Sequence, residues 1–142
     1  MSAPPTAPVL AVGAIVWKGD KILLIRRGTA PRKGFWSLPG GRQQWGETVF
    51  EAGIREIREE TGIEIRIVDT AAVVDLIDRA ADGSVAYHYT VVDLVAEWVS
   101  GDAVAGDDAA EVAWAARDEL AGYRLTAKTH EVIEIAARKR GG

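Results

Sequence analysis

The sequence predicts an α/β fold in which two main helices accompany one mixed, partly antiparallel β-sheet. Apolar runs rich in β-branched and aromatic residues recur along the chain, which is typical of strands. Two other segments repeat their apolar residues with the period of a helix. Strands and helices do not alternate regularly, so a doubly wound parallel sheet is not expected. At 142 residues, 48% of them hydrophobic, the chain is long enough for one domain with a core.

The first part of this domain is expected to be a β-hairpin. Two apolar runs, 9–17 and 21–27, flank a short turn that contains Gly19. The segments that follow are a loop over 28–34 and a short strand over 35–38, which ends at Pro39-Gly40-Gly41.

A helix is predicted over 47–61, with Gly62 in the left-handed conformation just beyond its end. Apolar residues at helical spacing are expected to bury one face of it: Phe50, Ile54 and Ile57. Gly53 lies in the middle of this helix, where glycine is unfavourable by about 1 kcal/mol relative to alanine. We therefore expect Gly53 at a position of close packing.

The second half of the chain is expected to complete the sheet and to end in a helix. In chain order the segments are strands 64–77 and 87–99 with a turn over 81–84, a loop over 101–108, a strand over 112–115, a helical turn over 117–122 and a helix over 127–140.

Composition excludes several kinds of site and partner. The chain has no cysteine, which rules out disulfides, thiolate metal sites and cysteine nucleophiles and suits a cytoplasmic protein. Its net charge of -4 does not favour long nucleic acids, although cations could bridge it to a small phosphorylated ligand. Residues 1–8 look like a flexible leader rather than a signal peptide, and 9–142 like a single domain. No apolar run is long enough to span a membrane.

The most informative feature is a cluster of carboxylates on the predicted helix. Glu56, Glu59 and Glu60 stand at i, i+3 and i+4, so helical geometry places them on one face. Like charges at this spacing repel each other. A divalent metal with a preference for oxygen ligands would stabilise them, and Mg²⁺ or Mn²⁺ is the expected ion.

A second interpretation of the same residues needs no metal. Glu51–Arg55 and Arg55–Glu59 salt bridges at i, i+4 would make this an ordinary acidic face exposed to water. The spacing of the charges alone does not decide between the two.

Residues 41–63 also match the pattern G-x5-E-x7-R-E-U-x-E-E-x-G-U, where U is a bulky aliphatic residue. The matching residues are Gly41, Glu47, Arg55, Glu56, Ile57, Glu59, Glu60, Gly62 and Ile63. This segment resembles the Nudix box, and residues 36–41 resemble the lead-in that usually precedes it. The resemblance implies an α/β/α sandwich with a loop-helix-loop metal site that hydrolyses the pyrophosphate bond of nucleoside diphosphate-X compounds.

The resemblance also implies roles for residues of the box. Glu59 and Glu60 correspond to metal ligands, and Glu56 to a ligand or the general base. Gly41 would add its backbone carbonyl to the metal. Glu47 and Arg55 are expected to pair and brace the loop against the helix, because a guanidinium grips a carboxylate at two points.

Residues outside the box are candidates for the substrate and for a further metal ligand. Arg26 and Arg27 end a predicted strand and would bind phosphate, or simply face water. Gly40 is expected beside the substrate. His88 would either face the substrate or pack within its strand.

The loop over 106–111 resembles the later loop of MutT-like and ADP-ribose pyrophosphatase-like members. There Glu111, with Asp108 second, would serve as a metal ligand or base; otherwise this is an exposed acidic loop. Trp45, in the box loop, would stack on a base or cover the site, whereas the other tryptophans are core candidates.

The sequence supports three functions, in order of preference. The first is hydrolysis of ADP-ribose or a related dinucleotide, and the second is sanitation of oxidised nucleoside triphosphates. The third is a nucleotide-binding regulatory module without catalysis. The resemblance also leaves a homodimer open.

Overall fold

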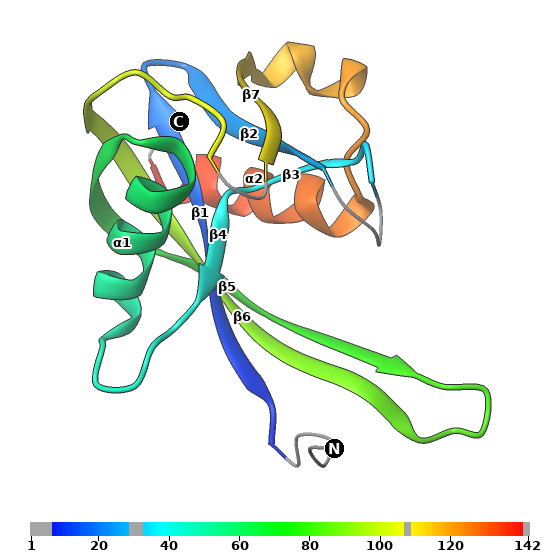
Figure 1. Cartoon of the computed structure of the whole chain (residues 1–142). Helices are drawn as coiled ribbons and strands as arrows, with labels where there is room; N and C mark the ends of the chain where they lie inside the picture. The colour runs from blue at the N-terminus through cyan, green and yellow to red at the C-terminus, as the bar shows by residue number, and fades with distance from the viewer. Residues whose placement is uncertain (1–6, 29–32, 107–108, 141–142) are drawn as a thin grey trace.

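The computed structural model describes residues 7–28, 33–106 and 109–140 and contains a seven-stranded sheet with helices on both faces (Figure 1). The strands are β1 (Val9–Lys18), β2 (Lys21–Arg27), β3 (Trp36–Ser37), β4 (Gly40–Arg42), β5 (Glu64–Arg79), β6 (Val85–Ser100) and β7 (Ala109–Ala116). The helices are α1 (Val49–Thr61), the 3₁₀ helix η1 (Arg117–Gly122) and α2 (Ala127–Lys139). The predicted elements occur in the predicted order, and β4 is an additional strand at the glycines where the preceding strand was expected to end.

The sheet is mixed, as predicted. Its main path runs β3-β2-β1-β6-β5, with β4 joined to β1 and β7 joined to β2. β1 and β6 are parallel, from Val9 opposite Tyr89 to Trp17 opposite Glu97, and all the other pairs are antiparallel.

One side of β1 is divided between two partners. It forms the predicted hairpin with β2 only beside the turn, at Trp17–Ile22 and Lys18–Lys21. Nearer its start, the same side of β1 pairs with β4, where Gly13 lies opposite Gly40. This division brings the glycines that precede α1 into the sheet.

Strand alternation gives the sheet two buried faces. On one face, Ile57 of α1 packs in a cluster with Val16 and Ala96. On the other face, Ile133 of α2 packs in a cluster with Ile15 and Val95. The two helices therefore cover opposite faces, which confirms the α/β/α sandwich.

Local signals set the ends of α1. Thr48 caps the N-terminus: its hydroxyl accepts from the Glu51 backbone N–H at 3.1 Å, and the Glu51 carboxylate accepts from the Thr48 N–H at 2.8 Å. At the other end Gly62 adopts φ 80°, and its N–H donates to the Arg58 carbonyl. The helix begins two residues later than predicted, which leaves Glu47 in the preceding loop.

The buried face of α1 differs from the predicted one. Phe50 is 45% exposed, so its assignment to the core is wrong. Ala52 and Gly53 face the sheet instead, together with Ile57. A Cβ on Gly53 would lie 2.8 Å from Leu94 Cδ1, which confirms close packing there.

Strands β5 and β6 form a long hairpin that projects from the rest of the molecule (Figure 1). Its outer part carries large apolar side chains in contact with solvent: Val73, Leu76, Ile77, Val85 and Tyr87. No helix among the described residues is long and apolar enough to cross a membrane. The leader over 1–8 falls mostly outside the described residues, and it and the single domain stay predictions.

Candidate functional site

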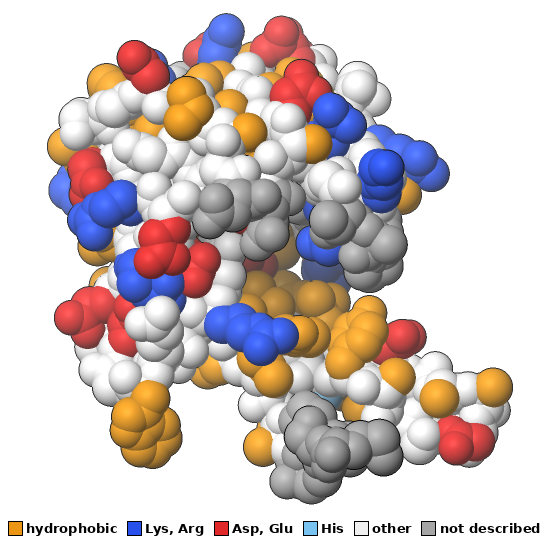
Figure 2. Space-filling view, in the orientation of Figure 1, with side chains coloured by type: hydrophobic (Ala, Val, Ile, Leu, Met, Phe, Trp, Pro, Cys, Tyr) orange, Lys and Arg blue, Asp and Glu red, His pale blue; other side chains and the backbone are white. Residues whose placement is uncertain are grey.

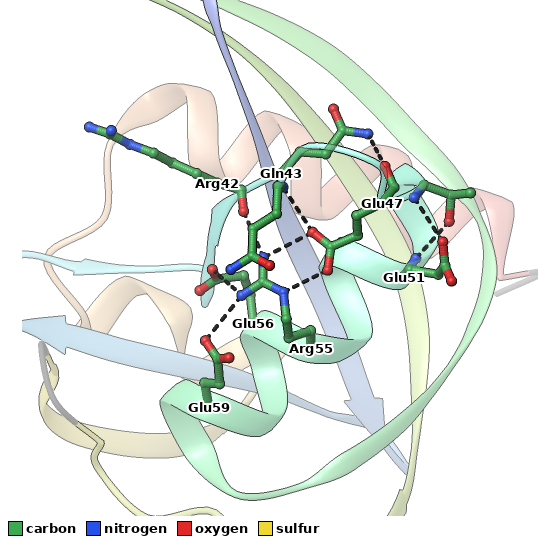
Figure 3. A network of polar contacts seen from close by, with 9 residues as sticks. Arg42, Gln43, Glu47, Glu51, Arg55, Glu56 and Glu59 are labelled. Carbon is green, nitrogen blue, oxygen red and sulfur yellow. Dashed lines mark hydrogen bonds and ion pairs between the residues drawn. The ribbon is translucent and has the colours of Figure 1, made fainter.

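Arg55, in the middle of α1, is the centre of a polar network that joins the preceding loop to the helix (Figure 3). Its Nε and Nη2 donate to the two oxygens of Glu47, at 2.6 and 3.0 Å. Its Nη1 donates to Glu56 at 2.8 Å and to Glu59 at 3.1 Å, and Nη2 also reaches the Arg42 carbonyl at 2.8 Å. These bonds use all the N–H groups that a guanidinium offers.

The predicted pairing of Glu47 and Arg55 is therefore confirmed. The hydrogen bond from Arg55, followed by one from the Gln44 backbone, lowers the pKa of Glu47. The same bond, with a smaller contribution from Glu56, raises the pKa of Arg55 above its usual value. Glu47 stands eight residues before Arg55, so this fork fixes the loop before α1 against the helix.

Only half of the alternative salt-bridge pattern is present. Arg55 contacts Glu59 at i, i+4. Glu51 does not belong to that series, because its carboxylate closes the capping box with Thr48.

Two consecutive glycines bring β4 against two of the glutamates. The Gly40 N–H donates to Glu60 Oε1 at 3.0 Å. Gly41 lies so close to Glu56 that an added Cβ would come within 2.1 Å of Glu56 Oε2. A side chain at Gly41 would displace the Glu56 carboxylate, whereas one at Gly40 would meet the backbone of Val12 and Gly13 on β1.

A third glycine brings the loop over 101–106 to the end of the same helix. The Gly106 N–H donates to the Glu60 carbonyl at 2.8 Å, and a Cβ on Gly106 would lie 2.5 Å from that oxygen. The Val104 N–H donates to the Thr61 carbonyl at 2.9 Å. The segment that leads to Glu111 thus passes the backbone of the glutamate cluster.

The oxygens gathered here suit a hard divalent ion. Glu56 and Glu59 both reach one nitrogen of Arg55, and Glu56 and Glu60 contact adjacent residues of β4. Within residues 7–28, 33–106 and 109–140 no three acidic or histidine side chains already stand in an arrangement that would hold a metal. A metal at this site would compete with Arg55 Nη1 for the oxygens of Glu56 and Glu59.

Arg26 and Glu111 form an ion pair that shares no residue with the Arg55 network. They stand opposite each other on β2 and β7, and Arg26 Nε donates to Glu111 Oε1 at 2.9 Å across exposed side chains. Arg27 follows at a bulge and is half-buried. The metal role of Glu111 and the phosphate role of the two arginines stay predictions, and Asp108 lies outside the described residues.

His88 and Trp45 are the remaining candidates for contact with the substrate. His88 is half-buried on the projecting hairpin, opposite Ile77 of β5. Trp45 is fully exposed in the loop before α1, at 104% of its reference area. These observations do not test the predicted substrate contact of His88 or the predicted stacking of Trp45, and both stay predictions.

Comparison with known proteins places this site in a family. Residues 7–136 match the NUDIX domain. The chain belongs to the NUDIX domain family. The resemblance of residues 41–63 to the Nudix box is thereby confirmed, and the glutamate cluster lies on the helix of that box.

Three relatives illustrate this membership. The chain is 42% identical over 104 residues to an ADP-ribose pyrophosphatase of Methanocaldococcus jannaschii, covering 73% of this chain and 59% of that protein. A MutT NUDIX hydrolase from Burkholderia pseudomallei has 36% identity and a TM-score of 0.77, over 90% of this chain and 97% of that one.

The third is a bifunctional NMN adenylyltransferase/ADP ribose pyrophosphatase from Francisella tularensis, whose structure is complexed with AMP and a manganese ion. It is 30% identical with a TM-score of 0.71, over 98% of this chain and 44% of that chain. The chain thus spans less than two thirds of two of these three relatives.

Two polar residues, one inside the Nudix box and one on β6, were given no role in the sequence analysis. Arg42 supplies the carbonyl that Arg55 binds, and its Nη2 donates to the Tyr89 hydroxyl at 3.1 Å. Asp93 interrupts the apolar run of β6 and is only 7% exposed. The sequence did contain a signal for Asp93, since it is a single acidic residue inside an apolar strand. Burying such a residue lowers stability unless it has a partner or a function.

Burial raises the pKa of the Asp93 carboxyl from its ordinary 3.8 to about 6. Between these values the folded protein holds a proton that the unfolded chain has released. The free energy of unfolding therefore falls as pH rises through this window, by up to about 3 kcal/mol for such a shift. At pH values above the pKa of Asp93 in the folded protein, its carboxylate is charged and lowers the free energy of unfolding by the full amount.

This cost gives the first testable prediction. Asp93→Asn removes the charge, so the variant should melt at a higher temperature than the wild type at about pH 7.5 and lose most of that advantage near pH 4. Thermal melts of both proteins across this range measure the difference. The explanation fails if the difference in melting temperature does not change with pH.

Arg55 gives a second prediction, on stability and activity together. Arg55→Lys keeps the charge but cannot fork to Glu47 while contacting Glu56, and should lose about 2 kcal/mol of stability. Because the carboxylates are then less well oriented, activity should fall by about 10- to 100-fold.

Arg58→Lys is the matched control on the same helix. Arg58 holds Glu64 at 2.6 Å through two nitrogens, but both side chains are exposed. We expect this variant to lose less than about 1 kcal/mol and to keep its activity. Equal effects of the two substitutions in urea unfolding and rate measurements would contradict the bracing role of Arg55.

Proposed function

We propose that this chain is a metal-dependent Nudix pyrophosphohydrolase that acts on nucleoside diphosphate-X compounds, with ADP-ribose or a related dinucleotide as its substrate. The observation that carries the proposal is the complete carboxylate set of the Nudix box, held by Arg55 and by two glycines of β4. The choice of ADP-ribose is supported by the name of the 42% identical relative from Methanocaldococcus jannaschii.

The residues of the site have distinct roles in this proposal. Glu56, Glu59 and Glu60 would hold Mg²⁺ or Mn²⁺, with the Gly41 carbonyl as a further ligand. When bound, the ion supplies neutralisation of phosphate charge and a more acidic water. Arg55 keeps the carboxylates in place, and one of the glutamates takes the proton of the attacking water.

The reaction breaks one P–O bond of the pyrophosphate and forms another to the water oxygen. From ADP-ribose the products are AMP and ribose 5-phosphate, and the proton of the water passes to a base of the site. Glu56 is our first choice for that base and Glu111 the second. Arg26, Arg27, Gly40 and His88 are proposed to contact the substrate.

A screen of substrates tests the proposal. ADP-ribose, NADH and an oxidised nucleoside triphosphate are each incubated with the protein and millimolar Mg²⁺ or Mn²⁺, and products are identified by mass. We expect ADP-ribose to be cleaved fastest and nothing to be cleaved in EDTA. Preference for the oxidised triphosphate would instead favour the sanitising function.

A third prediction concerns the metal itself. Binding to the folded state alone raises its stability, by about 2.7 kcal/mol when the ligand is present at a hundredfold excess over its dissociation constant. Millimolar Mg²⁺ should therefore raise the melting temperature, and ADP-ribose should raise it further only when the metal is present. An unchanged melting temperature in both cases would argue against the metal site and favour an ordinary acidic helix face.

The inactive regulatory module would show the opposite pattern to an enzyme: metal and nucleotide would bind without turnover. The cytoplasmic location, the homodimer and the lack of a nucleic-acid or membrane partner stay predictions from the sequence.

A further inference from the structure

Asp93 is a buried carboxyl that the proposed chemistry does not use. It stands on β6 between Gly13 of β1 and Ala72 of β5. Among the described residues its carboxyl has no hydrogen bond or ion pair, although the residue is only 7% exposed. A buried acid without a partner costs stability, so its position needs an explanation.

The neighbouring strand leaves room for this carboxyl. A Cβ added to Gly13 would lie 2.4 Å from Asp93 Oδ1, and the Pro39 carbonyl would be 3.8 Å from that Cβ. Gly13 also pairs with Gly40, the residue that binds Glu60. The space for Asp93 therefore adjoins the strand that positions the Nudix glutamates.

Asp93 marks the boundary between the covered and the open part of one sheet face. Beyond it on the same face, Val95 is fully buried in the cluster under α2. Before it, Val91 and Tyr89 are only half-buried, and so is Val74, which lies opposite Val91 and packs against the edge of the same cluster. Figure 2 shows apolar side chains on the floor of a hollow between the body of the molecule and the β5–β6 hairpin.

The open part of this face also carries a polar rim. Arg42 Nη2 donates to the Tyr89 hydroxyl, and the guanidinium lies 5.8 Å from the centre of the Tyr89 ring. The Arg42 carbonyl binds Arg55 of the Nudix box. One residue therefore connects this face with the site that is proposed to hold the pyrophosphate.

We propose that Asp93 binds the amino-bearing edge of the substrate's nucleobase, which lies on the open sheet face beside Tyr89. A base has flat apolar faces that suit Val91, Val74 and the Tyr89 ring. Its exocyclic amine is a donor, and a carboxyl oxygen is an acceptor. This inference deepens the proposed function and rests on a nucleotide being the substrate.

The proposal predicts discrimination between an amino and an oxo base. Adenine offers an N–H donor where hypoxanthine offers a carbonyl oxygen, and two acceptors facing each other are unfavourable. Wild-type protein should bind AMP at least about 10-fold more tightly than IMP, the effect expected for one hydrogen bond to a charged group. Binding is measured by calorimetry in EDTA, so that no turnover interferes.

Asp93→Asn tests the residue directly. The amide can donate to an oxo group, so the preference for AMP over IMP should disappear or reverse. With ADP-ribose and Mg²⁺ the KM should rise by about 10-fold while kcat stays within about threefold. The melting temperature of the variant should not fall, which separates lost recognition from lost structure.

Asp75→Asn is the control, since it removes the same charge from an exposed position on β5. It should leave the AMP to IMP ratio and the KM unchanged. The inference is overturned if wild type binds the two nucleotides equally or not at all, or if Asp93→Asn keeps the wild-type ratio and KM. Failure of the proposed function is a different result: no metal-dependent hydrolysis by the wild type, whatever the AMP to IMP ratio.

Discussion

Replacing Glu59 or Glu60 with Gln is expected to lower kcat for ADP-ribose hydrolysis by roughly 10²- to 10³-fold, the size of loss seen when one group directed at the reacting centre is removed. The amide keeps the shape of the carboxylate but not its charge. Glu56 and Glu59 both accept hydrogen bonds from Arg55 Nη1, and Glu60 accepts one from Gly40 of β4. The three carboxylates belong to one proposed metal site, so the loss of either charge weakens that site. Rates at saturating substrate and Mg²⁺ measure the effect.

Both variants are expected to stay folded. A glutamine at position 60 still offers an oxygen to the Gly40 N–H, which is the contact that ties β4 to α1. Glu59 is exposed, and removing one of several like charges relieves repulsion.

Glu131→Gln is the control for these variants. It makes the same change on α2, at an exposed residue that forms an ion pair with Lys128 on the same helix, far along the chain from the Nudix box. Its rate should equal that of the wild type. Wild-type rates for Glu59→Gln and Glu60→Gln would show that these two carboxylates have no role in the reaction.

Gly40→Ala and Gly41→Ala are expected to fail in different ways, although the residues are adjacent. A Cβ at Gly40 would lie 2.0 Å from the Val12 carbonyl oxygen and 2.8 Å from Gly13 Cα. Both are backbone atoms of β1 and cannot move without separating the strands. We expect a loss of about 3 kcal/mol, or roughly 10 °C in melting temperature.

A Cβ at Gly41 meets the Glu56 carboxylate instead, at 2.1 Å. This is the end of a flexible side chain, so it can turn away at a cost of about 1 kcal/mol. Activity should fall by about 10²-fold, because Glu56 is displaced from the site.

Gly122→Ala controls both substitutions, because its added Cβ would meet nothing within 4 Å. It should change stability by no more than about 0.5 kcal/mol. If the Gly41 variant proved fully active, or the Gly40 variant as stable as the Gly122 variant, the contacts between β4 and α1 would not have the importance assigned to them.

Local signals made much of the fold predictable. The C-terminal end of α1 was predicted from Gly62, whereas its start was placed two residues too early although Thr48 provides a local cap. The pairing of Glu47 with Arg55 followed from the family pattern. The exposure of Phe50 could not be predicted from periodicity, because it depends on which small residues meet Leu94 of a distant strand.

Contacts between distant segments account for the rest. Arg26 binds Glu111, which is 85 residues away, only because β2 pairs with β7 in one register. The burial of Asp93 depends on strands β1 and β5 on either side of it. No local pattern in the sequence specifies these neighbours, so Asp93 was missed although it interrupts an apolar run.

The most direct test of the proposed function is the hydrolysis of ADP-ribose in water labelled with heavy oxygen, followed by mass spectrometry of the products as Mg²⁺ is titrated. Cleavage at the pyrophosphate predicts AMP and ribose 5-phosphate, with one labelled oxygen in one of the two. The rate should require Mg²⁺ and should nearly vanish in Glu60→Gln. Intact ADP-ribose at every metal concentration, or equal rates in Glu60→Gln and the wild type, would contradict the proposal that these glutamates form a metal site for pyrophosphate hydrolysis.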